Sequence, residues 1–484
     1  MGEVGVRSCC YQAKRAQSQG MAEATPQTEQ PELHRAIGPK LLLFFVVGDI
    51  LGTGIYALTG NVAGKIGGAL WLPFLLAFVV AFLTAFSYLE LVGKYPKAAG
   101  AALYTNRAFK IHFLTFMVAF AVMCSGITSA SSAALAFGRT YLRQLLVEFF
   151  DVALAPESLV ITGIAIVFIA ALAVINFRGV SESVKANVVL TCIELSGLII
   201  IILIGAYAIA VGDGEPSRLT EIHTPSGSSV LLAVTSATAL AFFAMVGFED
   251  SVNMAEECRD PVRIFPRAML IGMAIAALIY VLVAITSSLL IPSEELAKAG
   301  SSALLKVVTV GAPGFPLWIF ALIGLLAVIN SALINMLMAS RLLYGMANEQ
   351  IIPKFFGVVH PFRRTPWISI VFTTGVAVIL VSTADIGKLG GTTSLLLLVV
   401  FTIVNVACLV LRREKVEHKH FRAPTWAPVL GAILCAYLAM PKLSGRPWDD
   451  YKIAGWLLLA GLVLWGINRV LHGKHEIHPE NLAK

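Results

Sequence analysis

"GDILGTGIYALTG", residues 48–60, sets four glycines in one apolar stretch. Residues 52–57 of it match G-x-G-x-x-A. Between a strand and a helix of a soluble βαβ unit, this pattern binds the pyrophosphate of a dinucleotide. In a membrane helix, the same glycines would instead interrupt the helix or let a neighbouring helix approach closely. The flanking sequence has to distinguish these interpretations.

The composition is typical of a membrane protein. Of the 484 residues, 57% are hydrophobic and only 13% are charged, whereas a soluble domain has about 25% charged residues. Apolar runs of roughly 20 residues, each able to cross about 30 Å of hydrocarbon, recur along the chain. Because residues 48–60 lie in such a run, we exclude the dinucleotide interpretation and predict an all-α integral membrane protein. The net charge of +7 does not indicate nucleic acid binding, since the basic residues lie in short links between apolar runs.

We predict twelve membrane spans with both termini in the cytoplasm. Most of the 36 Lys and Arg side chains fall in the links on the side of the termini, and this bias predicts that side to be cytoplasmic. The loop at residues 412–422, RREKVEHKHFR, contributes most to the bias. The predicted spans are approximately residues 41–66, 68–92, 112–144, 157–177, 184–211, 231–256, 267–292, 315–347, 367–384, 391–411, 425–441 and 453–471.

The segments outside the spans carry few signals. Residues 1–30 are polar and lack the apolar segment of a signal peptide, so we expect a disordered cytoplasmic tail over residues 1–34, with translation beginning at Met1 or Met21. A core follows over residues 35–440, then the twelfth span at 441–472 and a cytoplasmic tail at 473–484. The seven cysteines form no C-x-x-C pair and predict neither a metal site nor a disulfide framework.

The sixth span is interrupted in the same way as the first. It reads AFFAMVGFEDSVNMAEECRDP, with Gly247 followed at once by Glu249 and Asp250. Corresponding interruptions in two halves of a chain point to an inverted repeat with a binding site at mid-membrane. A half-helix that begins near Gly54 offers free N–H groups to an anion, and carbonyls freed near residues 243–245 can accept from a cation. Such a site suits a zwitterion such as an α-amino acid, although close packing of helices is an alternative explanation of the glycines.

Three motifs then resemble the amino acid–polyamine–organocation superfamily of transporters. Residues 48–56, GDILGTGIY, resemble its G-x-[IVL]-[IVL]-G-[ST]-G-[IV]-[FY] motif. The exit of the sixth span and the block SRLLYGMANEQIIP at residues 340–353 are similar to two further motifs. The resemblance covers roughly residues 35–440 and is nearest to bacterial amino acid permeases and cationic amino acid transporters. It implies a leucine-transporter-like fold, with spans 1–5 and 6–10 as inverted repeats, broken helices 1 and 6, and two peripheral spans.

The resemblance also implies two groups of substrate-binding residues. The group expected to hold the substrate carboxylate is Leu51, Gly52, Thr53 and Gly54. The group whose carbonyls are expected to hold the ammonium is Phe242, Phe243, Ala244 and Met245. Phe248 and its aromatic neighbours are candidates to close over the ligand, because ring faces attract ammonium; ordinary packing is the alternative for each ring.

Hydroxyl and amide side chains in the third and eighth spans are candidates to line the pathway. Ser125, Thr128 and Ser129 share one helical face, as do Ser331 and Asn335, with Asn330 adjacent. Small hydroxyls also pack helices together, and both interpretations stand. In sodium-coupled relatives a Thr-Ser pair aligns with Asn330-Ser331, and the departure at Asn330 argues against sodium binding.

Glu194 is the first candidate for coupling. Ser183, Asn187, Thr191 and Glu194 form a polar stripe on the fifth span, and Glu194 lies about 15 Å from the cytoplasmic end. An ionisable residue at that depth is costly and is by default a functional hypothesis. We expect Glu194 to take and release a coupled proton, with a neutral glutamate bonded to a neighbouring helix as the structural alternative. The cationic transporters carry a lysine at this position, so a lysine-based mechanism does not transfer.

Two further acids remain candidates for coupling. Asp49 precedes the first interruption, and Glu249 follows the second. An acid there can also place its charge at the N-terminus of the second half-helix, a structural role that we expect of Asp250.

Together the patterns predict a secondary active transporter that moves amino acids across the plasma membrane by alternating access, with protons as the coupled ion. Exchange of amino acids or polyamines, or a transporter-like nutrient sensor, is the alternative. We find no H-E-x-x-H, G-x-S-x-G or G-x-x-x-x-G-K-[ST] motif, which argues against an enzyme or an ATP-driven pump. The predicted partners are an amino acid, with a cationic one among the candidates, protons and the lipid bilayer, without cofactor, metal or nucleic acid; the sequence does not show whether there is a helper subunit.

Overall fold

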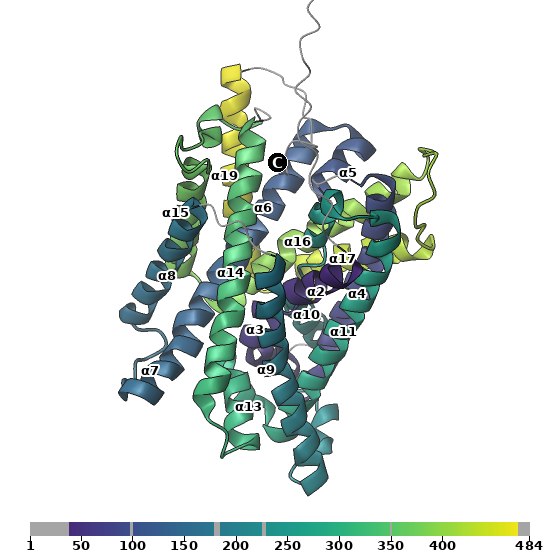
Figure 1. The fold of residues 1–484 in the computed structure, drawn as a ribbon. Helices are drawn as coiled ribbons and strands as arrows, with labels where there is room; N and C mark the ends of the chain where they lie inside the picture. The colour runs from purple at the N-terminus through teal and green to yellow at the C-terminus, as the bar shows by residue number, and fades with distance from the viewer. Residues whose placement is uncertain (1–37, 97–99, 179–183, 225–228, 349–350, 473–484) are drawn as a thin grey trace, which may run out of the picture.

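A computed structural model describes residues 38–96, 100–178, 184–224, 229–348 and 351–472, and the regular elements in these residues are all helices (Figure 1). The predicted tails, residues 1–34 and 473–484, lie outside the described residues. The α-helices are α2 (Pro39–Ile50), α3 (Thr53–Ile66), α4 (Trp71–Lys94), α5 (Gly100–Phe109), α6 (His112–Ala136), α7 (Arg143–Phe150), α8 (Leu159–Arg178), α9 (Val184–Val211), α10 (Val230–Ala241), α11 (Pro261–Leu290), α12 (Ser293–Ala299), α13 (Ala303–Gly311), α14 (Leu317–Asn348), α15 (Trp367–Thr383), α16 (Ile386–Leu411), α17 (Trp426–Ala439), α18 (Pro441–Ser444) and α19 (Trp448–His472).

Ten segments in the described residues are long and apolar enough to cross a membrane. They match ten of the twelve predicted spans, which confirms an all-α protein with many membrane-spanning segments. The remaining two predicted spans, the ninth and eleventh, correspond to the shorter apolar helices α15 and α17. With 17 and 14 residues, these helices are roughly 25 and 21 Å long, less than the hydrocarbon thickness of about 30 Å.

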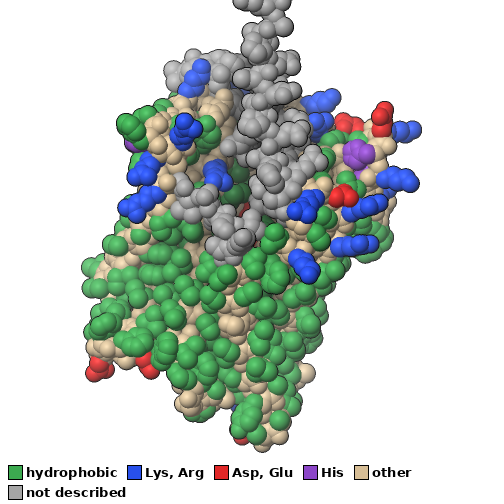
Figure 2. All heavy atoms as spheres, viewed as in Figure 1, with side chains coloured by type: hydrophobic (Ala, Val, Ile, Leu, Met, Phe, Trp, Pro, Cys, Tyr) green, Lys and Arg blue, Asp and Glu red, His purple; other side chains and the backbone are tan. Residues whose placement is uncertain are grey.

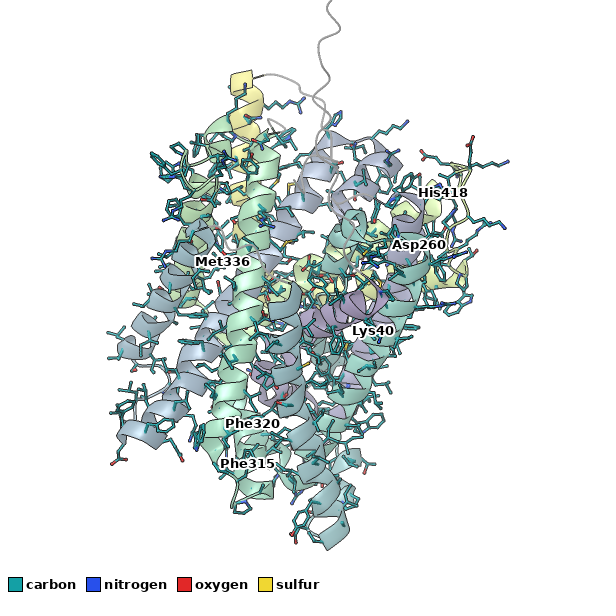
Figure 3. The ribbon with its side chains drawn as sticks, viewed as in Figure 1. Lys40, Asp260, Phe315, Phe320, Met336 and His418 are labelled. Carbon is teal, nitrogen blue, oxygen red and sulfur yellow. The ribbon has the colours of Figure 1, made fainter. Side chains whose placement is uncertain are left out.

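The surface agrees with this arrangement. Figure 2 shows hydrophobic side chains over the flank of the molecule, with Lys and Arg gathered at one end among a few acidic side chains, and further acidic side chains at the other end. The end with Lys and Arg, here called the basic end, holds α5, the loop between α16 and α17, and the C-terminal end of α19 (Figure 1). α14 runs along the molecule, with Phe315 and Phe320 toward the opposite end and Met336 nearer the basic end (Figure 3).

The basic loop after α16 is fixed to α4 by an ion pair. Glu90 is buried and accepts hydrogen bonds from Arg412 Nη2 at 2.7 Å, Arg412 Nε at 2.9 Å and the backbone N–H of Ala423 at 2.9 Å. The hydrogen bond to Glu90 raises the pKa of Arg412. The Lys94 ammonium donates to the carbonyls of Leu411 and Glu414. The loop that carries the predicted topology signal therefore also packs as part of the fold.

The two interrupted segments lie among the other helices. α2 packs against α9 and α11, whereas α3 packs against α10 and α12. α14 contacts α6 and α9, and α16 also contacts α6. This packing covers the irregular backbone at the interruptions with protein, as membrane-spanning chains require.

Candidate functional site

The first span is interrupted at the predicted glycines. α2 ends at Ile50 and α3 begins at Thr53, and the two residues between them, Leu51 and Gly52, are not helical. The hydroxyl of Tyr280 on α11 donates to the carbonyl of Ile50 at 2.5 Å. One backbone group freed by the interruption is thus satisfied by a side chain from a neighbouring helix.

The sixth span is interrupted over a longer stretch. α10 ends at Ala241, the 3₁₀ helix η3 (Phe242–Met245) follows, and Val246 is extended. Gly247 has φ +123°, and beyond it lies a second 3₁₀ helix, η4 (Asp250–Glu257), where an α-helical half was predicted. The backbone N–H of Gly247 donates to Glu249 Oε2 at 2.9 Å. The carboxylate that binds this freed amide is therefore that of Glu249, and Asp250 is the first residue of η4, the position that we expected for it.

The two interruptions touch each other. A Cβ atom on Gly247 would lie 2.6 Å from the carbonyl oxygen of Asp49 and 3.2 Å from the nitrogen of Ile50. A Cβ on Gly54 would lie 2.7 Å from the Cβ of Ala244 and 3.0 Å from its nitrogen. Glycine is therefore required at both positions by close approach, and at Gly247 also by the backbone conformation. The first turn of α3 lies directly against η3.

The start of α3 offers donors for an anion. Thr53 is the first residue of the helix and is 1% exposed. Its hydroxyl has no hydrogen-bond partner among the described residues. The first N–H groups of a helix also lack partners within the helix and carry a partial positive charge. The Thr53 hydroxyl and the first amides of α3 are therefore hydrogen-bond donors without a partner at one place, and an anion is able to accept from both.

The aromatic candidates lie in a packed cluster. Phe242 and Phe248 pack on Phe401 of α16, with ring centroids 5.9 and 5.3 Å apart, and Tyr88 of α4 lies 5.8 Å from Phe248. All of these rings are buried, in agreement with the packing alternative. Phe243 is also buried and lies beside α16: a Cβ on Gly390 would be 3.5 Å from its ring.

Glu194 connects α9 to α14. It is 1% exposed, and its Oε1 accepts from Asn330 Nδ2 at 3.2 Å. Its Oε2 is buried and finds no hydrogen-bond partner in the part of the chain that the structure describes. The hydrogen bond to Asn330 agrees with the alternative in which Glu194 is a structural residue bonded to a neighbouring helix. The unpaired Oε2 agrees with the hypothesis that Glu194 accepts a proton. Of the predicted stripe, Ser183 and the side chain of Asn187 lie outside the described residues.

Thr191, another member of the polar stripe on α9, lies close to the first interruption. A Cβ on Gly48 would overlap the hydroxyl of Thr191, so α2 and α9 are in direct contact there. The hydroxyl of Tyr56 on α3 donates to the carbonyl of Glu194 at 2.5 Å, and Tyr141 in turn donates to the carbonyl of Tyr56 at 2.7 Å. The backbone on both sides of the interruption is thus connected to the helix that carries Glu194.

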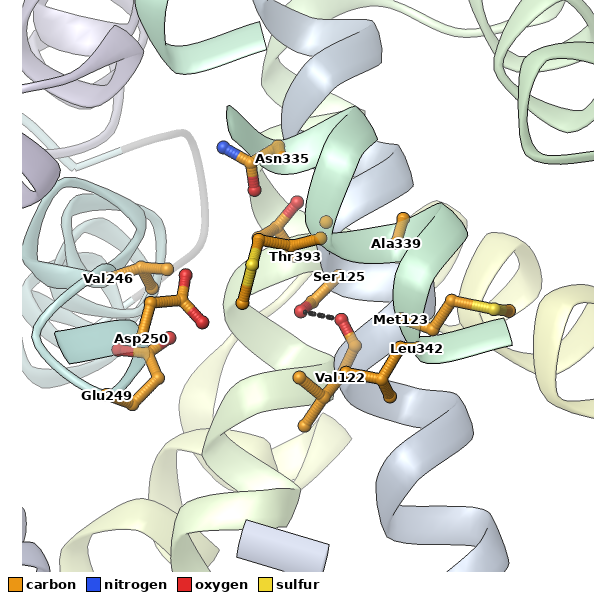
Figure 4. Close-up of a pocket in the computed structure, with 12 residues that line it drawn as sticks. Val122, Met123, Ser125, Val246, Glu249, Asp250, Asn335, Ala339, Leu342 and Thr393 are labelled. Atoms are coloured by element: carbon orange, nitrogen blue, oxygen red, sulfur yellow. Dashed lines mark hydrogen bonds between the residues drawn. The ribbon is translucent and has the colours of Figure 1, made fainter. Parts of the chain in front are cut away.

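A small cavity of about 20 Å³ lies beside the second interruption (Figure 4). Val246, Glu249 and Asp250 line one side, and Ser125 and Asn335 lie on the opposite side. Figure 4 shows the hydroxyl of Ser125 donating to the carbonyl of Val122, at 2.7 Å. The volume is sufficient for a water molecule but not for an amino acid.

The remaining pathway candidates fall into two groups. Thr128 is fully buried, and its hydroxyl lies 2.6 Å from that of Thr393 on α16; Ser129 is also buried. Ser331 lies against the first interruption, 3.0 Å from the position of a Cβ on Gly52, and its carbonyl accepts from Asn335 Nδ2 at 2.8 Å. Of the predicted residues on α6 and α14, Ser331 therefore lies at the first interruption, and Ser125 and Asn335 line the cavity beside the second.

Comparison with known proteins identifies the family. The family model described as "Amino acid permease" matches residues 37–450. The chain belongs to the amino acid permease family. It is 27% identical over 473 residues to the methylthioribose transporter of Bacillus subtilis (strain 168), covering 93% of this chain and 96% of the relative. The branched-chain amino acid permease BcaP of the same organism is 22% identical, with 92% and 95% covered. The mitochondrial cationic amino acid transporter 3 of Arabidopsis thaliana is 28% identical, with 82% and 65% covered.

The family is one of transporters rather than enzymes, within the amino acid–polyamine–organocation superfamily, and the predicted resemblance is confirmed. The sequence analysis of this permease did not predict several side chains that form hydrogen bonds around the interruptions. Tyr56, Tyr141 and Tyr280 all donate to backbone carbonyls near the first interruption, and Thr393 bonds Thr128. The available signal was a tyrosine within an apolar span, whose hydroxyl needs a partner when it is buried. That signal does not identify the partner.

Proposed function

We propose that this permease is a secondary active transporter that carries amino acids into the cell together with protons, and that the substrate binds where the two interruptions meet. The observation that carries the proposal is the contact between the start of α3 and η3. This contact places the residues predicted to bind the substrate carboxylate next to the residues predicted to bind its ammonium. Thr53 and the first N–H groups of α3 would hold the carboxylate. Carbonyls of residues 242–245 would hold the ammonium.

The proposed topology has twelve spans, with spans 1–5 and 6–10 as inverted repeats and α15 and α17 as the ninth and eleventh spans. Two features support it. The interruptions occur in spans 1 and 6, which are corresponding positions of two five-span repeats. The basic end lies at the side of the C-terminal end of α19, which supports a plasma membrane protein with both termini in the cytoplasm (Figure 2).

Glu194 is proposed as the residue that takes and releases the proton. Its Oε1 is held by Asn330, while its buried Oε2 is without a hydrogen bond in the described structure. The backbone of Glu194 is connected to the proposed substrate-binding helix, because the Tyr56 hydroxyl of α3 donates to the carbonyl of Glu194. Protonation of this acid would therefore affect the helix whose N-terminus is proposed to bind the substrate. Asp49 and Glu249, at the contact between the interruptions, remain the further candidates.

The substrate is proposed to be a small neutral or cationic amino acid. The relatives are named for branched-chain amino acids, cationic amino acids and methylthioribose, so the family name leaves the solute open. The paired donor and acceptor backbone favours a zwitterion over a neutral sugar. Glu249 and Asp250 beside the small cavity favour a positive or small neutral side chain.

Transport by the purified full chain in liposomes tests this proposal. The panel consists of radiolabelled L-alanine, L-leucine, L-lysine and L-arginine, with methylthioribose as the non-zwitterionic control. An acidic exterior is expected to drive accumulation of at least one of the amino acids, and a protonophore is expected to abolish it. Counterflow without accumulation would show an exchanger instead. Binding without any counterflow would show a sensor, and uptake of methylthioribose alone would contradict the proposed site.

A further inference from the structure

The side chain of Arg446 lies buried among four helices. Arg446 follows α18 and precedes α19, and its side chain is 1% exposed. Its Nε donates to the carbonyl of Leu438 on α17 at 2.9 Å, and its Nη1 donates to the carbonyl of Gly391 on α16 at 2.8 Å. Nη1 also lies 3.4 Å from Asp450 Oδ2 on α19. These partners offset the cost of burying a cation, which is large when the charge is unpaired.

The fourth helix is α10, where the carbonyl of Ala239 accepts two side-chain hydrogen bonds. Arg446 Nη2 donates to this carbonyl at 3.0 Å and to the hydroxyl oxygen of Ser394 at 2.7 Å. The Ser394 hydroxyl on α16 in turn donates to the Ala239 carbonyl at 2.5 Å. The five N–H donors of the guanidinium thus all have a partner in the protein. Arg446 has no donor left for a ligand.

The Ala239 carbonyl belongs to the last turn of α10, directly before the interruption of the sixth span. In a continuous α-helix it would accept from the N–H of residue 243, but α10 ends at Ala241 and residue 243 lies in η3. The last carbonyls of a helix need donors from elsewhere, and a cation beside them also interacts favourably with the helix dipole. Arg446 and Ser394 therefore stabilise the end of α10, and with it the start of η3.

Two further contacts hold the turn that carries Arg446 against α10. A Cβ on Gly445 would lie 3.1 Å from the carbonyl oxygen of Leu232. The hydroxyl of Thr235 donates to the carbonyl of Ser444 at 3.2 Å. Since α17 and α19 are the spans outside the two proposed repeats, these contacts connect both peripheral spans to the first half of the sixth span.

We propose that Arg446 is a positioning residue for the substrate ammonium, acting through the Ala239 carbonyl. Together with Ser394 it fixes the end of α10 on α16, and this determines where the carbonyls of η3 lie. The inference rests on the proposed function, in which the carbonyls of residues 242–245 bind the ammonium. The two peripheral spans thus contribute to the selectivity of the site for solutes that carry an amino group.

Two substitutions in the full chain, reconstituted in lipid nanodiscs, test the proposal. Ser394→Ala removes one of the two side-chain donors to the Ala239 carbonyl and keeps the ion pair of Arg446 with Asp450. Arg446→Lys keeps the positive charge, but lysine has one nitrogen in place of the three that bond to α10, α16 and α17. Neither substitution changes a residue proposed to touch the substrate.

The readout is the selectivity of binding for the α-amino group. Equilibrium dialysis gives the Kd of the radiolabelled amino acid that shows the fastest uptake in the liposome panel. Competition gives the Kd of the carboxylic acid with hydrogen in place of its α-amino group, which is propanoate for L-alanine. Wild type is expected to favour the amino acid. Both variants are expected to lower the ratio of the two Kd values about tenfold, because displaced η3 carbonyls weaken the ammonium contact alone.

Ser444→Ala is the matched control, because the Ser444 hydroxyl is also buried but donates to the Met440 carbonyl at the start of its own short helix, at 2.6 Å. It is expected to keep the wild-type ratio. A wild-type ratio in either test variant, or equal weakening of both ligands, overturns the positioning role and leaves the proposed function intact. If the wild type binds no amino acid, or binds the acid without the amino group equally well, the proposed function and the inference both fail.

Discussion

Gly247→Ala is expected to force the two interruptions apart. Gly247 has φ +123°, a backbone conformation that L residues rarely adopt and that costs an alanine about 1–3 kcal/mol. The new Cβ would also lie 2.6 Å from the carbonyl oxygen of Asp49, whereas ordinary contacts begin at 3.4 Å. One backbone segment therefore has to move by about 0.8 Å, and overpacking of this kind costs about 1–3 kcal/mol. The combined effect is about 2–6 kcal/mol, and it falls at the proposed substrate site.

The assay combines uptake with thermal stability of the purified protein. Gly247→Ala is expected to insert into the membrane, to melt at a lower temperature than wild type and to lose at least nine-tenths of its uptake. Gly375→Ala is the matched control: Gly375 lies in α15, and nothing is within 4 Å of a Cβ placed there. Alanine in a helix is favourable, so this control is expected to transport normally. Wild-type uptake and stability in Gly247→Ala would refute the contact between the interruptions as a functional feature.

Three further substitutions probe separate parts of the molecule. Glu194→Gln keeps the bond to Asn330 but carries no exchangeable acidic proton, so it is expected to retain amino acid counterflow and to lose accumulation driven by a pH gradient. Thr53→Val removes one hydroxyl at nearly constant shape and is expected to raise the Kd for the transported amino acid about tenfold, measured by equilibrium dialysis. Arg412→Leu leaves the buried Glu90 carboxylate without its cation, and the expected loss of stability is about 3 kcal/mol, measured as the free energy of unfolding in denaturant.

The Glu194 and Arg412 substitutions each have a matched control on the surface. Glu148→Gln changes an exposed glutamate of α7 and is expected to keep pH-driven accumulation; the same accumulation in Glu194→Gln would remove Glu194 from the proton pathway. Arg413→Leu removes the neighbouring exposed cation and is expected to be nearly neutral. Equal stabilities of the Arg412 and Arg413 variants would show that the loop is not held by Glu90. An unchanged Kd in Thr53→Val would place the carboxylate elsewhere.

The main features of the membrane core follow from the sequence because they carry a physical cost in lipid. Glycine in an apolar span weakens the helix, and the interruptions occur as expected at Gly52 and Gly247. Glu194 was identifiable as a candidate functional residue because an ionisable side chain at that depth in the membrane is energetically costly. Most span positions follow from the length of apolar runs alone.

The contacts between distant segments were not predictable in this way. Tyr280 and Ile50 are 230 residues apart in the chain, and Arg446 reaches a carbonyl 207 residues away. Such pairs produce no periodic pattern in a single sequence, since each side chain bonds to a residue of another helix and not to residues near it in the chain. For the same reason, nothing in the sequence indicates that the Arg446 side chain bonds to four separate helices.

An experimental density map of the permease with its transported amino acid bound is the decisive observation. We predict the ligand carboxylate within hydrogen-bond distance of the Thr53 hydroxyl and the first amides of α3, and the ammonium at the carbonyls of residues 242–245. A ligand bound elsewhere, with α2 and α3 joined in one unbroken helix, would contradict the proposed transport site.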